Sequence, residues 1–190
     1  MNTFSGLEKI VEKDYQLAKH TWYGLGGRAD FFIRPQTTEQ LREVVQRCNE
    51  NNIDIHVMGF GSNLLINDDH VSGAVIKLEG EEFVRTEFQK EGITAGAGAE
   101  LNKIVLECPE KGLSGIEMLT GIPGSLGGAV RMNAGGRFGD IGDSVVSVTL
   151  MDNLGNIFEK SKPELMFDYR STNITANLIL EVKIRLTETD

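Results

Sequence analysis

The sequence contains few of the residues that build metal sites and disulfides. Its 190 residues include two cysteines and three histidines, with no Cys-x-x-Cys pair and no Cys/His cluster. A metal site is therefore not expected, nor is Ser/His/Asp chemistry. Cys48 and Cys108 lie far apart on apolar helical faces, and we expect two buried thiols in a reducing compartment rather than a disulfide.

Basic charge and long hydrophobic runs are also scarce. The 28 acidic residues outnumber the 19 basic ones, and the net charge of −9 argues against nucleic acid or an anionic membrane as a partner. No stretch approaches the roughly 18 apolar residues of a membrane helix, and the N-terminus lacks the pattern of a signal peptide. We expect a cytoplasmic protein, and the sequence carries no signal for its oligomeric state.

Apolar patterning in residues 1–80 predicts a small α/β unit. A stripe within residues 4–18 indicates a short helix, and residues 30–34 read as a strand. A capping box of Thr37 and Gln40 starts a helix whose apolar residues recur at helical spacing. Strands are expected at residues 53–58 and 74–78, with a glycine-rich loop directly after the first of these.

Residues 81–190 are richer in strands, mostly antiparallel, with helices inserted. Hairpins are predicted for residues 83–95 and for residues 145–160, the second turning at 152–155. A helix over residues 100–107 should end at Pro109. Residues 162–166 read as a helical turn started by proline, and residues 178–186 as the last strand. The chain is thus of the α+β class, with a boundary near residue 80.

Two glycine-rich loops are the strongest functional signal. The first, Gly59-Phe-Gly-Ser-Asn-Leu64, follows a buried strand, and its backbone N–H groups could face an anion without obstruction by a Cβ. It lacks the third glycine of a Rossmann fingerprint and the Gly-Lys-Ser/Thr of a P-loop. The alternative is an ordinary tight turn.

The second loop, Gly121-Ile-Pro-Gly-Ser-Leu-Gly-Gly-Ala129, places four glycines in eight residues. Such glycine content is entropically costly for a simple turn, so it favours close approach of a ligand; the alternative is a close helix–strand crossing. Gly24-Leu-Gly26-Gly27 fits a third ligand loop or a turn equally well, and Gly96-Ala-Gly98 reads as structural. Tyr169-Arg170, before the last strand, offers a cation, although a lone arginine is usually solvated surface.

Taken in order, these landmarks resemble one family, the UDP-N-acetylenolpyruvoylglucosamine reductases, also called UDP-N-acetylmuramate dehydrogenases. The resemblance covers about residues 18–188, and the ordered set is far more specific than any single motif. The matching landmarks are His20-Thr21, Gly26-Gly27-x-Ala29-Asp30, Pro35, Gly59-x-Gly61-Ser-Asn63-Leu64-Leu65, Gly115-Ile-Glu117, Gly121-Ile-Pro-Gly-Ser125, Gly127-Gly-Ala129, Met132-Asn-Ala-Gly135 and Phe167-x-Tyr169-Arg170.

The resemblance implies the two-subdomain FAD-binding fold of the vanillyl-alcohol oxidase/PCMH type: a small α/β subdomain at 1–80 and an antiparallel-sheet subdomain at 81–190. FAD would lie between the two. The first loop would hold the pyrophosphate, and the second would border the pyrophosphate and the flavin. The cofactor-binding residues implied are Gly59, Phe60, Gly61, Ser62, Asn63, Leu64, Gly121, Ile122, Pro123, Gly124, Ser125, Gly128, Asn133 and Ile179.

The resemblance also implies the reaction. NADPH would give a hydride to FAD, and the reduced flavin would pass it to the enolpyruvyl group of a UDP-sugar during peptidoglycan precursor synthesis. Arg170 would stabilise the negative charge that develops, and Tyr169 would shape the site.

Members of the family continue into a third domain with a proton-donating serine, a late carboxylate and most substrate contacts. This chain is therefore expected to be the FAD-binding part, as a fragment or as a naturally short homologue, with little turnover alone. Thr172 also stands where the family often has serine. Two other functions remain open: a non-catalytic FAD- or nucleotide-binding module serving a partner chain, and a flavin oxidoreductase with another substrate.

Overall fold

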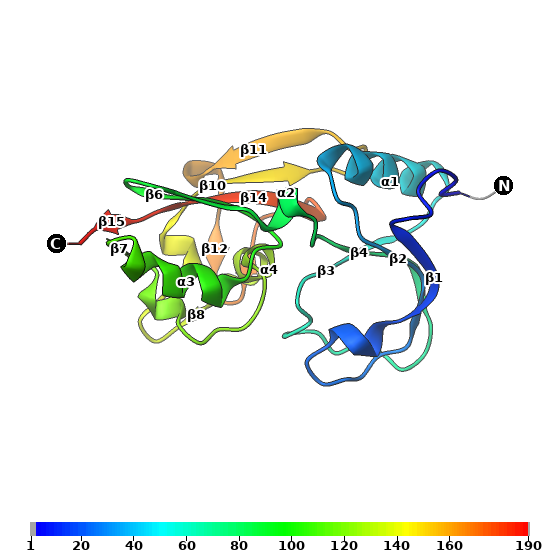
Figure 1. Cartoon of the computed structure of the whole chain (residues 1–190), viewed down its shortest axis with the longest axis horizontal. Coiled ribbons are helices and arrows are strands. Elements are labelled where there is room, and N and C mark those ends of the chain that lie inside the picture. Colours follow the sequence, from blue (N-terminus) through cyan, green and yellow to red (C-terminus); the bar gives the residue numbers. More distant parts are fainter. Residues whose placement is uncertain (1–2, 190) are drawn as a thin grey trace.

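The described part of the chain, residues 3–189, forms two main β-sheets in this computed structural model, with helices packed between and around them (Figure 1). The outermost positions of the expected subdomains, residues 1–2 and 190, lie outside the described part. The chain passes from the first sheet to the second between β4 (Val71–Lys77) and β5 (Thr86–Gln89). This crossing lies close to the subdomain boundary predicted near residue 80, which stays a prediction.

The first sheet has the strand order β1-β2-β4-β3. Strands β2, β4 and β3 run parallel, and β1 is antiparallel to β2. The helix α1 joins β2 to β3, so a βαβ unit forms the centre of this subdomain. The bounds are β1 Val11–Gln16, β2 Arg28–Ile33, α1 Thr38–Glu50, β3 Ile55–Met58 and β4 Val71–Lys77.

The start of α1 confirms Thr37 as the helix cap but forms only half of the predicted capping box. The Thr37 hydroxyl accepts a hydrogen bond from the Gln40 N–H, and the Gln40 side chain in turn accepts from the N–H of Gln36, one residue before the cap. The helix buries the expected stripe of Leu41, Val44, Val45 and Cys48 against the sheet.

The N-terminal segment corrects a prediction. The stripe within residues 4–18, expected to be helical, folds as turns followed by strand β1 and the 3-10 helix Leu17–His20. Val11 pairs with Ile33 across the sheet, and Asp14 has a φ of 49°, which interrupts any helix there. Backbone pairing with β2 therefore decides the conformation of this segment, and the helical spacing of its apolar residues does not.

The second sheet has the order β11-β10-β14-β6-β5, and every pairing in it is antiparallel, as predicted. Both hairpins are confirmed, and the second turns at Asp152–Gly155. Small two-stranded ladders complete this half. The bounds are β5 Thr86–Gln89, β6 Gly92–Gly96, β7 Leu113–Ser114, β8 Gly135–Gly136, β9 Gly139–Asp140, β10 Val145–Met151, β11 Ile157–Ser161, β12 Phe167–Asp168, β13 Ser171–Thr172, β14 Leu178–Arg185 and β15 Thr187–Glu188.

Three local predictions in this half need correction. Residues Glu81–Val84 form the short helix α2 instead of the start of a strand, because Gly80 caps them and Phe83 turns into the core. Helix α3, Leu101–Glu110, contains Pro109 instead of ending at it; in the last turn the missing N–H costs a single helical bond. A short strand, β15, follows the expected last strand and pairs with β7.

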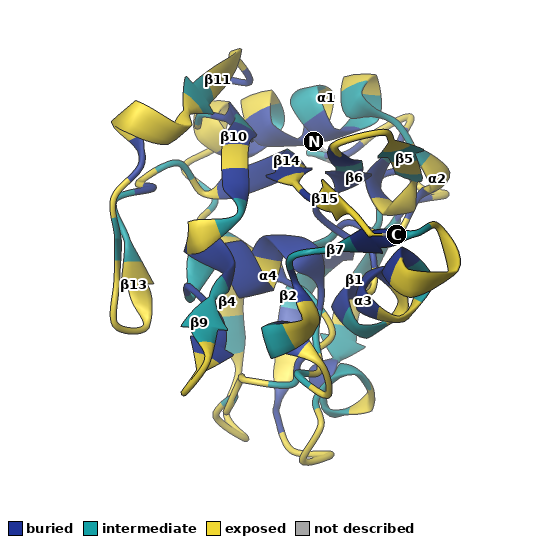
Figure 2. Ribbon diagram, turned by 90° about the vertical axis from the view of Figure 1, so that its left-hand side faces the viewer, coloured by how far each residue is buried: buried dark blue, intermediate teal, exposed yellow. Residues whose placement is uncertain are grey.

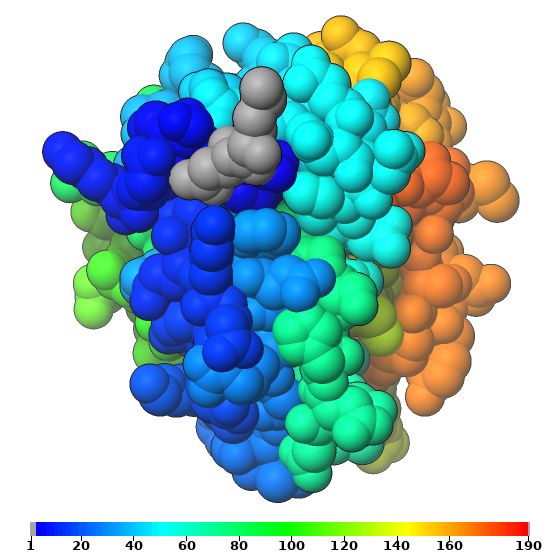
Figure 3. Space-filling view, turned by 90° about the vertical axis from the view of Figure 1, so that its right-hand side faces the viewer, coloured from blue at the N-terminus to red at the C-terminus, as the bar shows by residue number. Residues whose placement is uncertain are grey.

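One hydrophobic core joins the two sheets. A single cluster of buried side chains runs from α1 and the first sheet to α3, α4 (Leu126–Arg131) and β14. The expected buried thiols, Cys48 and Cys108, belong to it, and burial raises the pKa of each to about 11. Seen from one end, the N-terminal subdomain fills most of the face (Figure 3). Among residues 3–189, no helix is long and apolar enough to cross a membrane.

Candidate functional site

The two glycine-rich loops meet between the two sheets. The first loop follows β3 of the first sheet, and the second runs into α4, which packs on β14 and β6 of the second. The Ser62 hydroxyl donates a hydrogen bond of 2.9 Å to the carbonyl oxygen of Pro123, which links the loops directly. The fold therefore brings together two motifs that are far apart in the sequence.

A cavity of about 580 Å³ opens along this contact. That volume is in the range of small-molecule binding pockets. Most residues expected to bind a cofactor line it, namely Gly59, Phe60, Gly61, Ser62, Asn63, Leu64, Ile122, Pro123, Gly124, Ser125 and Gly128. Arg170, expected to be catalytic, lines it too, together with Met132, Ala134 and Gly135.

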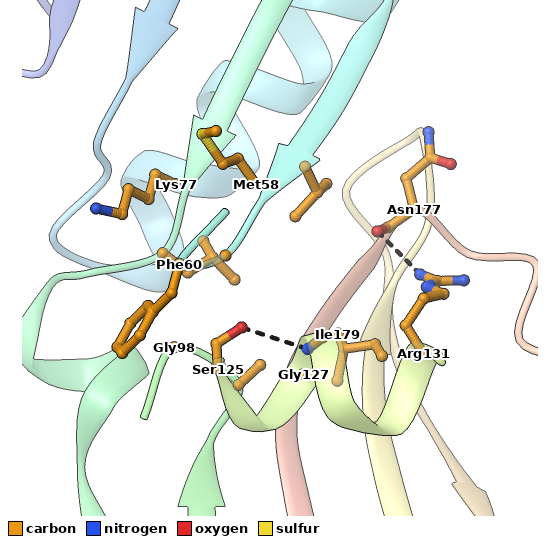
Figure 4. A pocket seen from close by; sticks show the side chains of 14 residues that line it. Met58, Phe60, Lys77, Gly98, Ser125, Gly127, Arg131, Asn177 and Ile179 are labelled. Carbon is orange, nitrogen blue, oxygen red and sulfur yellow. Dashed lines mark hydrogen bonds between the residues drawn. The ribbon is translucent and has the colours of Figure 1, made fainter. Parts of the chain in front are cut away.

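A smaller cavity of about 110 Å³ adjoins the first and is drawn in Figure 4. Met58, Phe60 and Lys77 lie on its side toward the first sheet, and Ser125, Ile179 and Arg131 lie across from them. Ile179, predicted from the last strand, therefore lies in this cavity instead of the larger one. Residues that line both cavities are Val57, Gly59, Phe60, Ser125, Gly128 and Arg131.

A third cavity, of about 650 Å³, borders the same contact between the loops, and it shares Phe60, Ser62, Pro123 and Gly124 with the 580 Å³ cavity. Gly121 lines it, as do Pro123 and Gly124 of the same loop, with His20 and Lys77 from the first subdomain. The side chain of His20 is held by the Tyr15 hydroxyl at 2.9 Å and by Lys77 Nζ at 3.3 Å. Burial, followed by the charge of Lys77, lowers the pKa of His20 below its usual value of 6.5.

Two close approaches explain why the first loop needs glycine. A Cβ on Gly59 would lie 2.3 Å from the Ser125 hydroxyl oxygen, so a side chain here would displace that hydroxyl from its hydrogen bond with the Gly128 N–H. Gly61 has a φ of +67°, and a Cβ there would lie 2.0 Å from the carbonyl oxygen of His20. Glycine at these two positions therefore allows the first loop to pack closely against Ser125 on one side and against His20 on the other.

The charges around the two adjoining cavities are all positive. Arg131 and Arg170 line the larger cavity, and Lys77 and Arg131 line the smaller one, whereas neither lining contains an aspartate or a glutamate. This contrasts with the net charge of −9 for the chain. A cleft whose only charges are cationic, in an acidic protein, favours an anionic ligand.

Arg170 is held at the tip of the β12–β13 hairpin, which projects from the body of the molecule (Figure 2). Its backbone has a φ of 55°, and its guanidinium donates to the carbonyl oxygens of Gly135 at 2.9 Å and Asn133 at 3.4 Å. Tyr169, by contrast, is 83% exposed and lines none of the three cavities; its ring lies 5.4 Å from the Arg170 guanidinium.

Asn133 is buried, its chain neighbours Met132 and Ala134 line the larger cavity, and its own side chain forms hydrogen bonds with protein groups. Its amide donates to the carbonyl of Asp168, and its side-chain oxygen accepts from the N–H of Gly142. These bonds attach the Arg170 hairpin to the segment after α4. The predicted contact of Asn133 with a cofactor stays a prediction, and the structure gives the residue a supporting role.

The two other glycine-containing segments differ in where they lie relative to the cavities. The loop at Gly24–Gly27 lines none of the three cavities and packs as a turn, because a Cβ on Gly27 would lie 1.7 Å from the Asp69 carbonyl oxygen. Gly98, expected to be structural, packs against Leu78 and also lines the smaller cavity. Among the described residues, no group of three or more His, Cys, Asp or Glu side chains could hold a metal ion.

Sequence reasoning missed Arg131, Asn177 and Lys77 among the lining residues. A signal for the first was available, since Arg131 is the first charged residue after the long run of small and apolar residues that begins at Gly121. Asn177 and Lys77 carry no comparable signal, because strands and loops far from the motifs bring them to the cavity.

Comparisons with known proteins agree with this geometry. Residues 29–161 match a family model described as "FAD binding domain". The chain is 39% identical over 180 residues to the UDP-N-acetylenolpyruvoylglucosamine reductase of Clostridioides difficile (strain 630), covering 94% of this chain and 59% of that protein. The enzyme of the same name from Rickettsia conorii is 37% identical, with 89% and 57% covered. The chain thus spans somewhat over half the length of these curated relatives.

Solved structures show the same relationship. The crystal structure of UDP-N-acetylenolpyruvylglucosamine reductase from Thermus caldophilus superposes with a TM-score of 0.81 at 35% identity, covering 95% of this chain and 63% of that one. The 6-hydroxy-D-nicotine oxidase of Arthrobacter nicotinovorans gives a TM-score of 0.63 at 18% identity and covers 97% of this chain and 40% of that one, a likeness of fold alone. The expected two-subdomain FAD-binding fold is confirmed.

Proposed function

Because the chain belongs to the family of FAD binding domains, we propose that it holds FAD in its two adjoining cavities and serves the reduction of a UDP-sugar. The reaction proposed for the whole protein is the NADPH-linked reduction of UDP-N-acetylglucosamine enolpyruvate to UDP-N-acetylmuramate in peptidoglycan precursor synthesis. The substrate is the one that the names of the relatives give, and NADPH is the donor that the family resemblance implies. The observation that carries the proposal is the meeting of two glycine-rich loops beside Arg170.

The residues present fit a dinucleotide cofactor. The two cavities share the wall formed by Gly59, Ser125 and Gly128, where a Cβ on Gly59 would obstruct the space. Exposed backbone donors and the absence of acidic side chains in the lining suit the diphosphate at the middle of FAD. The smaller cavity, with Met58, Leu78 and Ile179, is mostly apolar and would take one end of the molecule; the larger would take the other.

When bound, FAD supplies the hydride chemistry. The residues of this chain orient the cofactor and place charge. Arg170 keeps a cation at the larger cavity, where it would stabilise the negative charge that develops beside the enolpyruvyl carboxylate. The carbonyl oxygens of Asn133 and Gly135 fix its guanidinium in advance of substrate, so little reorganisation is needed. Tyr169, exposed beside it, would contact substrate from the rim.

The chain covers the FAD-binding part of its relatives, so catalysis by these residues alone is not expected. In this proposal the proton donor and most substrate contacts come from the remaining part of the relatives' length. A cytoplasmic setting and NADPH as donor belong to the same proposal.

The cofactor claim is tested by titrating the purified chain with FAD. We expect a bound-flavin absorbance band, quenched flavin fluorescence and a rise in melting temperature, because a ligand that binds only the folded state stabilises it. A titration that shows neither spectral change nor a shift in melting temperature contradicts the proposal.

The substrate claim needs a second assay. NADPH oxidation is followed in the presence of the enolpyruvyl UDP-sugar, first with this chain. The assay is then repeated with the full-length reductase of Clostridioides difficile that carries methionine at the position matching Arg170. We expect almost no turnover from the chain alone, and loss of substrate reduction but retention of FAD in the relative. If FAD binds and reduction continues with another acceptor only, the alternative of a different flavin oxidoreductase replaces this substrate.

A further inference from the structure

Arg131 lies at the boundary between the two cavities and has no part in the proposed reaction. It is the last residue of α4, directly after the second glycine-rich loop. It is one of the residues that line both cavities, and the only charged one among them. Figure 4 shows its side chain reaching from α4 toward Asn177, across from Met58 and Phe60.

Among residues 3–189, the Arg131 guanidinium forms all of its hydrogen bonds to protein with one segment of backbone, residues 174–177. It donates to the carbonyl oxygens of Ile174 and Ala176, each at 2.5 Å, and of Asn177 at 3.0 Å. This segment connects β13, which follows Arg170, to β14, which carries Ile179. The Arg131 side chain therefore holds α4 against residues 174–177. This segment lies in the chain between Arg170, which lines the larger cavity, and Ile179, which lines the smaller one.

The charge of Arg131 has no acidic partner in the described chain. No carboxylate among residues 3–189 lies within 4.0 Å of its guanidinium, whereas arginines at 28, 34, 47 and 85 each pair with one. Burial alone lowers the pKa of this half-buried group, and an arginine stays protonated under all ordinary conditions. The carbonyl oxygens satisfy three of its donors but carry no net charge, so the positive charge of Arg131 stays available to attract an anion.

We propose that Arg131 recognises the diphosphate of the bound dinucleotide. The three carbonyl bonds leave two of its five N–H donors without a recorded acceptor in residues 3–189. The diphosphate is the doubly anionic middle of such a ligand, and Arg131 belongs to the set of residues shared by the cavities that would hold the two ends. This inference rests on the proposed function, because it presupposes a dinucleotide in these cavities.

The role follows from two properties of one side chain. The carbonyl bonds hold the guanidinium in place, and its charge attracts the anion. The backbone donors of the glycine loops cannot supply full charge, so Arg131 would set the affinity for the charged part of the ligand while leaving the affinity for its neutral part nearly unchanged. A merely structural clamp would affect both parts equally, and this difference is measurable.

The test compares ADP with adenosine by isothermal titration calorimetry, for the wild-type chain and for Arg131→Gln and Arg131→Lys. ADP carries the diphosphate, and adenosine lacks it. We expect R131Q to weaken ADP binding by about ten- to hundredfold, the range of a lost charge-assisted interaction, and to change adenosine binding by less than about threefold. R131K, which keeps the charge, should keep most of the ratio of ADP to adenosine affinity.

Arg42→Met is the matched control, since Arg42 also donates to a backbone carbonyl, that of Gly155 at 3.1 Å, but lines none of the three cavities. It should leave both affinities unchanged. Equal weakening of ADP and adenosine by R131Q overturns the inference and leaves the proposed function intact. If R131Q does not fold, R131K decides: a tenfold drop in the ADP-to-adenosine ratio refutes a charge-based role. A wild-type chain that binds neither FAD nor ADP refutes the proposed function itself.

Discussion

The Ser62 hydroxyl donates a 2.9 Å hydrogen bond to the carbonyl oxygen of Pro123, a residue 61 positions along the chain. This bond joins the loop that leaves the first sheet to the loop that enters α4 in the second. Both residues line the larger of the two cavities proposed for FAD, so the contact between the loops and the shape of that cavity depend on the same few atoms.

Ser62→Ala should therefore weaken FAD binding more than it weakens folding. Loss of one exposed hydrogen bond costs about 1 kcal/mol, or about fivefold in affinity, if the loops must be brought together on binding. Flavin fluorescence quenching measures the affinity. Ser114→Ala is a suitable control, because Ser114 also donates to a carbonyl, that of Thr187, away from the cavities. Equal FAD affinity for S62A and S114A would show that this bond does not organise the site.

Gly59→Ala tests the close contact between the loops. The new Cβ would lie 2.3 Å from the Ser125 hydroxyl oxygen, which accepts from the Gly128 N–H at the start of α4. We expect a lower melting temperature and loss of FAD binding. Because the clash is with one oxygen, the double variant Gly59→Ala, Ser125→Ala should regain part of the melting temperature.

The control for that pair is Gly136→Ala, where a Cβ would meet nothing within 4 Å. This variant should match the wild type in both measurements. If the double variant melts no higher than Gly59→Ala alone, the contact with Ser125 is not what makes glycine necessary at position 59.

The fold and the site differ in how far the sequence predicts them. The loops were identifiable because glycine and proline mark them locally, and the α1 stripe and the hairpins follow from short-range patterns. The N-terminal strand was mistaken for a helix because its partner strand, β2, decides its conformation. The sequence marks Arg131 as the first charged residue after the glycine-rich run. Its hydrogen bonds to carbonyls 43 to 46 residues away follow from no local pattern, so the segment that it holds could not be predicted.

Asn133→Asp should destabilise the hairpin that carries Arg170. The change replaces an amide donor, which now serves the carbonyl of Asp168 and lies near the carboxylate of Asp140, with an acceptor. The left-handed φ of 41° is tolerated by both residues, so backbone strain does not enter. We expect a loss of about 1–3 kcal/mol, read as a lower urea midpoint, with the exposed Asn153→Asp as control. An unchanged midpoint would contradict the supporting role of Asn133.

His20 and Lys77 give a prediction about pH. Burial and then the charge of Lys77 lower the pKa of His20 in the folded state, so the folded protein binds fewer protons than the unfolded chain in this window. The stability that His20 contributes is therefore present above its unfolded pKa of about 6.5 and is lost as the pH falls through the folded value. Lys77→Met should raise the pKa of His20, measured from its ring resonances by NMR. Lys19→Met is the matched control, because Lys19 lies nearby but is not among the charges that act on His20. A His20 titration that is the same in both variants would rule out Lys77 as a cause.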